Sequence, residues 1–222
     1  MNLELKKRII TSVILLFLLT TMFFYTYVLI ISVLFFSLIA WIEFYALISK
    51  IFSNNSNKDK ILRLLYKTLS LLYLFILVYL IIVIKSRNPE YEIFIIYSIL
   101  VSIMSDTGGL IIGKIFKGRK LTKISPKKTV SGAIGSIIFS IILIPLFIEY
   151  FDNYHFLKLF IITLFISLIS QLGDLFISLL KRTANVKNSS DLLPGHGGVL
   201  DRIDGMIFAI PFGFFIFIYL QA

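Results

Sequence analysis

Long apolar runs recur along this chain, and they restrict its fold more than any other feature. The runs lie near 9–24, 27–48, 62–84, 93–113, 131–150, 156–180 and 205–221. A helix of about 20 apolar residues crosses the ~30 Å hydrocarbon core of a bilayer. Helices also satisfy their backbone hydrogen bonds internally, as lipid demands. The sequence therefore predicts an all-α polytopic integral membrane protein with about seven transmembrane helices.

The composition supports this class and excludes others. Hydrophobic residues make up 58% of the chain and charged residues 15%, whereas soluble domains have about 45–50% and about 25%. The chain has no cysteine, so disulfides, thiolate zinc sites and cysteine nucleophiles are excluded. Only two histidines are present, His155 and His196, which leaves few ligands for a multi-histidine metal site.

The basic residues predict an orientation. If the N-terminus is cytoplasmic and the spans alternate, the inside segments hold 19 of the 22 Lys and Arg residues; these segments are 1–8, 49–67, 114–128 and 181–202. Basic residues favour cytoplasmic loops, so we assign the net charge of +10 to loops facing anionic lipid rather than to nucleic acid. The basic start, with no small-residue cleavage site after it, predicts an uncleaved anchor.

A polar segment, Ser178–Asp204, separates two of the most apolar runs. It contains charges of both signs around a glycine cluster, namely Lys181, Arg182, Lys187, Asp191, Asp201, Arg202 and Asp204, with Pro194, Gly195, His196, Gly197 and Gly198. Glycines allow backbone amides to point at a phosphate, although glycine turns are common and His196 could equally be a satisfied loop histidine. The charge density predicts a loop that holds a charged ligand.

Two aspartates, Asp106 and Asp174, lie within apolar runs. A lone carboxylate at the bilayer centre costs about 2.5–3.5 kcal/mol on insertion scales, so such residues usually face a partner, an ion or the bundle interior. Asp174 belongs to a polar stripe at helical spacing, formed by Gln171, Asp174, Ser178 and Lys181. A buried ion pair with a basic residue is the structural alternative.

Three carboxylates could converge if the last two spans pack antiparallel: Asp174, Asp201 and Asp204. In a helix starting near Val199, Asp201 and Asp204 would point to one side and lie in its first turn. Capping of that helix by one of them is the structural alternative. An oxygen-only ligand set suits Mg²⁺, which shares its shell with substrate phosphates.

The loop 114–128 carries seven positive charges and no acid. With Ser125, Lys128 and Thr129 at its end, it would suit a polyphosphate, but an anchor on anionic lipid explains the charge equally well. The chain contains no Walker-type GxxxxGK[ST] motif, which excludes a P-loop.

Together these motifs closely resemble the phosphatidate cytidylyltransferases (CDP-diacylglycerol synthases). The signature runs from Ser178, Lys181, Arg182 and Lys187 through Pro194–Gly198 to Asp201, Arg202 and Asp204. Further similarity lies at Ser105–Gly108, Gly113–Lys114, Ser125–Thr129 and Gly173–Asp174, and near the start at residues 6–12 and at Trp41 and Glu43. The chain departs from the family at Asn188, where an aspartate is usual, and looks short in its N-terminal half.

The resemblance implies that CTP and phosphatidic acid give CDP-diacylglycerol and pyrophosphate in phospholipid biosynthesis. It implies Mg²⁺, as one or two divalent cations with room for a monovalent one, held by Asp174 and Asp201 with Asp204 in support. Phosphate contacts are then expected from Lys181, Arg182, Lys187, Arg202 and the glycine turn, and from Ser125, Lys128 and Thr129. Asp106 either orders the basic loop or joins the cation shell.

The remaining expectations concern organisation. Residues 1–92 are predicted to form three N-terminal spans, and 93–222 a catalytic region with cytoplasmic loops 114–130 and 181–204. The expected location is a bacterial inner membrane, with the active site facing the cytoplasm; a homodimer is left open.

Two other functions are weighed. A CDP-alcohol phosphotransferase is disfavoured because its DGx2ARx8Gx3Dx3D pattern is absent. An ion-coupled transporter could use Asp106 and Asp174, but that role leaves the charged 178–204 segment unexplained.

Overall fold

The computed structural model describes residues 3–54, 56–151, 154–195 and 197–221, which form helices and turns with no named strand among them. Six helical segments are long and apolar enough to cross a membrane, and a shorter apolar helix covers Val13–Met22. This confirms an all-α polytopic membrane protein. The chain divides into two compact units, one of residues up to Arg87 with Leu180–Ile203, the other of Asn88–Leu179 with residues from Asp204. The boundary therefore crosses a helix.

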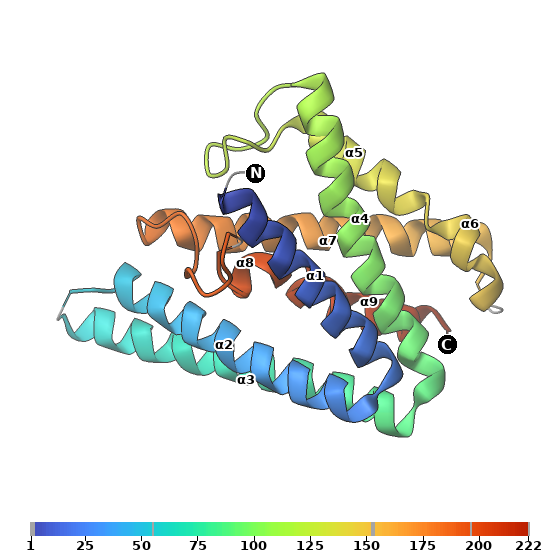
Figure 1. Ribbon diagram of the computed structural model, residues 1–222, viewed down its shortest axis with the longest axis horizontal. Coiled ribbons are helices and arrows are strands. Elements are labelled where there is room, and N and C mark those ends of the chain that lie inside the picture. Colours follow the sequence, from blue (N-terminus) through green and yellow to red (C-terminus); the bar gives the residue numbers. More distant parts are fainter. Residues whose placement is uncertain (1–2, 55, 152–153, 196, 222) are drawn as a thin grey trace. The chain divides into compact units, whose positions relative to one another are not determined.

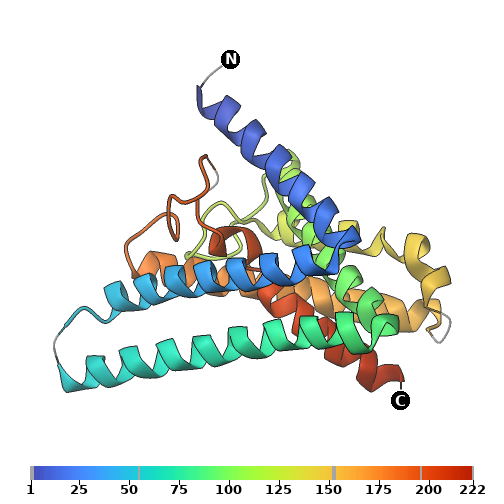
Figure 2. The same cartoon turned by 60° about the horizontal axis from the view of Figure 1, so that its bottom comes forward.

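The first unit contains α1 (Leu3–Phe24), α2 (Thr26–Ile51), α3 (Asn57–Arg87) and the short α8 (Leu200–Ile203). Tyr25 has an extended backbone that ends α1 and begins α2. Helices α2 and α3 lie side by side along their length (Figures 1 and 2). α3 begins earlier than the predicted 62 because the Ser56 hydroxyl accepts a hydrogen bond from the Asp59 amide at 3.2 Å, which caps the helix.

The second unit contains six helical elements and most of a seventh. They are η1 (Pro89–Tyr91), α4 (Glu92–Phe116), α5 (Val130–Ile141), α6 (Ile144–Phe147), η2 (Ile148–Tyr150), α9 (Met206–Gln221), and α7 (Phe156–Thr183) up to Leu179. The span predicted at 131–150 is interrupted after Ile141. Pro145 in α6 explains the break, because proline has no amide hydrogen and its ring clashes with the carbonyl four residues earlier.

Small residues hold α4 against its neighbours. A Cβ on Gly108 would lie 2.5 Å from the Gly135 carbonyl oxygen, so α4 and α5 approach closely near the basic loop (Figure 1). Hydroxyl pairs join α4 to α7, among them Ser102 with Ser170 at 2.7 Å. These contacts fix the end of α4 that carries Asp106.

An aromatic cluster forms the opposite part of this unit's core. The rings of Phe94 and Phe217 stack with centroids 4.7 Å apart, and Phe151 stacks on Phe217 at 5.0 Å. The Tyr154 hydroxyl donates to the Phe217 carbonyl at 2.6 Å, and burial raises the pKa of Tyr154 to about 12. Tyr154 therefore stays protonated, and its hydrogen bond joins the segment before α7 to α9.

The expectation that one helix carries both Asp201 and Asp204 is wrong. α8 ends at Ile203, Asp204 and Gly205 form a turn, and α9 begins at Met206. The Asp204 carboxylate accepts a hydrogen bond from the Gly205 amide at 2.9 Å, which stabilises this turn. The two aspartates consequently do not share a helix face.

Candidate functional site

The polar loop begins where α7 is terminated by its own backbone. Asn185 adopts the left-handed conformation (φ 55°), the Val186 amide donates to the Lys181 carbonyl at 2.9 Å, and the Asn185 amide donates to Arg182 at 3.0 Å. This pair of bonds is the Schellman pattern, in which asparagine tolerates the strained position. It leads the chain out of the helix directly after Lys181 and Arg182.

Glu43 on α2 accepts hydrogen bonds from two separate parts of that loop, residues 189–190 and residues 199–200. Its side chain is 4% exposed, and its carboxylate accepts four hydrogen bonds. The donors are the hydroxyls of Ser189 (2.8 Å) and Ser190 (2.5 Å) and the amides of Val199 (3.0 Å) and Leu200 (2.8 Å). A buried carboxylate is stable only when it is paired or fully hydrogen-bonded, so this set of donors explains an acid within an apolar helix.

Asp201 is engaged in a similar way. One carboxylate oxygen pairs with Lys181 Nζ at 2.6 Å, and the other accepts bonds from the Ser189 amide (2.9 Å), the Ser189 hydroxyl (3.0 Å) and the Gly198 amide (3.0 Å). Asp201 does not cap α8, because the amides at the start of that helix, of Val199 and Leu200, donate to Glu43. We call the carboxylates of Glu43 and Asp201, with their donors, the loop clamp.

The glycines fit inside this clamp because they lack side chains. A Cβ on Gly198 would lie 2.0 Å from Ser189 Oγ, and Gly197 has a φ of +85°. The Gly197 amide donates to the Leu193 carbonyl at 3.1 Å, and the Gly198 amide donates to Asp201. Both amides therefore serve the loop itself, and their contact with a phosphate stays a prediction. Gly195 is exposed, with φ +76°, and His196 lies outside the described residues.

In the second unit, a tight turn shapes the end of the basic loop. The Lys128 amide donates to the Ser125 carbonyl at 3.0 Å, with Pro126 in the second position of the turn, where its fixed φ is favoured. The Thr129 hydroxyl then caps α5 by accepting from the Gly132 amide at 3.0 Å. Ser125, Lys128 and Thr129 are therefore held in one rigid corner.

This corner brings Lys128 to the intramembrane carboxylates. Lys128 Nζ forms an ion pair with Asp174, whose second oxygen accepts from the Ser178 hydroxyl at 3.3 Å. Asp106 on α4 interacts electrostatically with both Asp174 and Lys128. We call Asp106, Lys128 and Asp174 the Lys128 cluster. The side chains of Lys128 and Asp174 are 25% and 24% exposed, so the cluster is accessible.

Asp204 approaches the same region through its backbone. A Cβ on Gly173 would lie 2.9 Å from the Asp204 carbonyl oxygen, so the turn before α9 rests on the residue next to Asp174. Asp204 itself is 8% exposed. Among the described residues, no three histidine, aspartate or glutamate side chains form a group that could hold a metal ion. The ligand set of Asp174, Asp201 and Asp204 stays a prediction.

The remaining predicted residues lie on the surface of their unit. Arg182 is exposed and donates to the Val186 carbonyl at 3.4 Å. Arg202 is exposed on α8, and Lys187 is exposed in the loop with Asn188 and Asp191. Their phosphate contacts stay predictions.

Sequence reasoning assigned no role to Glu43 and overlooked Ser189 and Ser190. A signal for Glu43 was present, because it is the one acidic residue in the apolar run that became α2. Its partners gave no such signal, since serines in a polar loop are ordinary.

Known proteins resemble this chain in the regions just described. A sequence model of the cytidylyltransferase family matches residues 2–220. Two relatives bear the name phosphatidate cytidylyltransferase. One, from Rickettsia typhi, is 49% identical over 125 residues, which cover 52% of this chain and 54% of the relative. The other, from Bacillus subtilis, is 38% identical over 151 residues, covering 67% and 56%.

The matched regions thus span about half the length of these curated relatives. The family match, by contrast, takes in α1–α9, the loop clamp and the Lys128 cluster, and it leaves only the terminal residues outside. On this ground the chain belongs to the cytidylyltransferase family.

Proposed function

We propose that this protein is a phosphatidate cytidylyltransferase, which makes CDP-diacylglycerol and pyrophosphate from CTP and phosphatidic acid. The family match over residues 2–220, with relatives of that name at 38–49% identity, carries the proposal. The Lys128 cluster supports it, because it combines a basic loop with intramembrane carboxylates, a combination suited to a phosphate-bearing lipid.

The proposed reaction needs charge control more than proton transfer. An oxygen of the lipid phosphate forms a bond to the α-phosphorus of CTP, and the bond from that phosphorus to the β-phosphate oxygen breaks. Pyrophosphate leaves with the electron pair. Because the lipid phosphate is already an anion, no strong general base is required. The protein must hold the anions in line and offset their charge.

The predicted basic residues are proposed to do this. Lys128 and Lys181 are each paired with an aspartate, and a phosphate oxygen is a comparable partner for either lysine. On binding of the triphosphate, we expect Lys128 to turn from Asp174 toward a phosphate. Further contacts are proposed for Ser125 and Thr129 in the basic corner and for Arg182, Lys187, Arg202 and the glycine turn, including Gly195 and His196.

A divalent cation fits the Lys128 cluster better than the loop clamp. Asp106 and Asp174 supply hard carboxylate oxygens. They share one lysine, Lys128, so its positive charge offsets only one of their two negative charges. In contrast, Asp201 already accepts four hydrogen bonds. We propose that Asp174 is the principal ligand of Mg²⁺, with Asp106 beside it and Asp201 and Asp204 as the other predicted ligands. When bound, Mg²⁺ supplies neutralisation of phosphate charge.

We further propose that the N-terminus and the two polar loops face the cytoplasm of a bacterium, where CTP is present. The asymmetry of lysine and arginine supports this orientation. Cysteines placed singly at exposed positions of the 114–128 loop and labelled from one side of the membrane would test it.

The direct test of function supplies labelled CTP and phosphatidic acid to membranes that carry the protein. Lipid-bound label that depends on both substrates and on Mg²⁺ is expected, and membranes with the Asp174→Asn variant serve as the control. Folded wild-type protein that forms no CDP-lipid would overturn the proposal and favour the transporter alternative. CDP-lipid formation that persists in the presence of a chelator would overturn only the Mg²⁺ requirement.

A further inference from the structure

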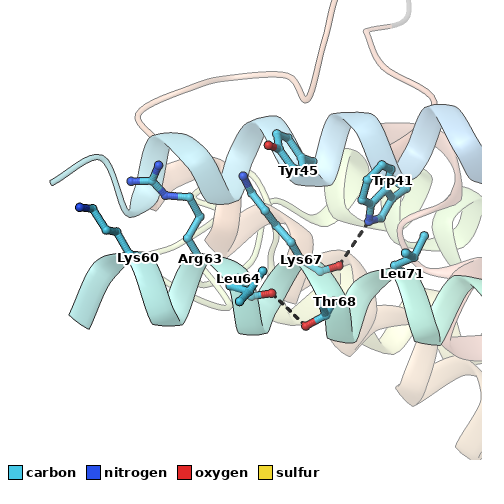
Figure 3. A pocket seen from close by; sticks show the side chains of 8 residues that line it. All are labelled: Trp41, Tyr45, Lys60, Arg63, Leu64, Lys67, Thr68 and Leu71. Carbon is cyan, nitrogen blue, oxygen red and sulfur yellow. Dashed lines mark hydrogen bonds between the residues drawn. The ribbon is translucent and has the colours of Figure 1, made fainter. Parts of the chain in front are cut away.

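A groove lies between α2 and α3, and its lining shares no residue with the loop clamp or the Lys128 cluster. Its volume is about 360 Å³, within the range of small-molecule sites. Figure 3 shows the side chains that line it: Trp41 and Tyr45 from α2, and Lys60, Arg63, Leu64, Lys67, Thr68 and Leu71 from α3. The residues from α3 recur at helical spacing and form one stripe facing α2. The proposed reaction uses none of these side chains.

The groove is chemically divided along its length. Lys60, Arg63 and Lys67 bring three positive charges to the end near the α2–α3 connection, with Leu64 among them, whereas Leu71 lies beyond them, is apolar and is 48% exposed. Both helices are candidate membrane spans. A site that is basic at one end and apolar at the other matches a molecule with an anionic head and a hydrocarbon chain.

One nitrogen of Arg63, Nε, has no hydrogen-bond acceptor among the described residues, and the phosphate of an anionic head would supply one. One of the terminal nitrogens of Arg63 donates to the carbonyls of Phe52 and Asn54, which fixes the side chain at the end of α2. Its Nε is buried and has no hydrogen-bond partner within the described part of the chain. An unsatisfied buried donor costs about 1–3 kcal/mol. A phosphate oxygen in the groove, reached by a small rotation of the guanidinium, would remove that cost.

On the α2 side of the groove, Trp41 and Tyr45 already contact Lys67 of α3. Lys67 Nζ lies 3.2 Å from the centre of the Tyr45 ring, and the Trp41 indole donates to the Lys67 carbonyl at 3.3 Å (Figure 3). Tryptophan and tyrosine favour the level of the lipid headgroups. The aromatic pair therefore holds one cation in place in the groove.

We infer that this groove is a binding site for an anionic phospholipid of the bilayer, separate from the proposed catalytic residues. Lys60, Arg63 and Lys67 contact the phosphate, Trp41 and Tyr45 flank the glycerol region, and an acyl chain lies along Leu71. The exposed apolar end favours a lipid over a soluble phosphate. A soluble phosphate has no acyl chain and would leave that end of the groove uncovered.

Trp41 makes the inference testable, because it is the only tryptophan in the chain. The protein is reconstituted into phosphatidylcholine nanodiscs that contain a small fixed fraction of phosphatidylglycerol with brominated acyl chains, which quench nearby tryptophan. Brominated phosphatidylcholine at the same fraction is the reference. We expect stronger quenching by the anionic lipid, and a preference that falls about five-fold for each cation removed.

The variants separate a site from general attraction. Lys60→Gln with Lys67→Gln should abolish the preference without touching the Arg63 bonds to Phe52 and Asn54, and Arg63→Gln should weaken it. Lys58→Gln removes one charge, as Arg63→Gln does, from the same helix outside the groove and should preserve the preference. Circular dichroism confirms that each variant is folded.

Three results would overturn the inference: equal quenching by the two lipids, an equal loss of preference in Lys58→Gln, or displacement of the anionic lipid by inorganic phosphate at matched ionic strength. None of these readouts depends on CDP-lipid synthesis. Failure of this inference is therefore distinguishable from failure of the proposed function.

Discussion

The loop clamp and the Lys128 cluster contain the same charges but use them differently. Each has two carboxylates and one lysine: Glu43 and Asp201 with Lys181 in the clamp, Asp106 and Asp174 with Lys128 in the cluster. In the clamp, each carboxylate accepts four hydrogen bonds. In the cluster, Asp174 has the lysine and one hydroxyl as partners.

This difference separates carboxylates that stabilise the loop from carboxylates that are free to exchange partners during the reaction. A carboxylate surrounded by backbone amides and hydroxyls is held in place and in turn holds its donors. A carboxylate balanced mainly by one lysine side chain can exchange that partner for a cation or release it to a phosphate. We therefore expect the clamp to govern the stability of the loop and the cluster to govern turnover. The following predictions test this division, in order of decreasing effect.

Asp174→Asn should have the largest effect. Loss of the charge removes the partner of Lys128 and the proposed principal cation ligand, and we expect turnover to fall by about a thousand-fold, or ~4 kcal/mol. The thermal midpoint should change little, because the pair is partly exposed. Steady-state CDP-lipid synthesis and thermal unfolding in detergent measure the two quantities. Near-normal turnover would contradict the role of the cluster.

Glu43→Gln should act mainly on stability. The amide keeps one acceptor but turns an NH₂ group toward donors, which leaves buried donors unsatisfied; we expect a loss of about 2–3 kcal/mol. Limited proteolysis should show faster cleavage between Ser189 and Leu200, and the thermal midpoint should fall. Turnover should decline only as the loop opens. Unchanged protease resistance together with a large loss of turnover would reverse the assignment and make Glu43 part of the chemistry.

Lys128→Gln should reduce turnover by about ten-fold to 150-fold, since a charged hydrogen bond is worth ~1.5–3 kcal/mol. Lys127→Gln is the matched control, because Lys127 is an exposed neighbour in the same turn. It should retain nearly full turnover. Equal losses in the two variants would mean that the charge of the whole loop matters, and not the ion pair with Asp174.

Asn188→Asp should have the smallest effect, within about two-fold in turnover. Asn188 is exposed, and exposed charges contribute about 0–1 kcal/mol. The new carboxylate would lie near Gly197, where an added Cβ would be 3.4 Å from Asn188 Cγ and 2.9 Å from Asp201 Oδ2. A rise of ten-fold or more would show that an acid at this position takes part in the reaction and that the loop clamp is not purely structural.

Much of the site could be predicted because its residues are conspicuous in an apolar chain. Asp106, Asp174 and the basic loop stood out, and the structure brings them together as the Lys128 cluster. The clamp could not be predicted, because Glu43 is separated from its donors by 146 to 157 residues. The break between α8 and α9 was missed because no proline marks it; the turn is stabilised by Asp204 and the Gly205 amide.

The membrane class, the approximate spans and the identity of the charged residues all follow from the amino-acid sequence alone. They do so because lipid requires long apolar helices and penalises each unpaired charge. Only the tertiary structure decided which carboxylate meets which partner. An aspartate pairs as readily with a lysine as with an amide, and the choice depends on which groups packing brings within hydrogen-bonding distance. In this protein, that choice made Asp201 part of a clamp and left Asp174 with an exchangeable lysine.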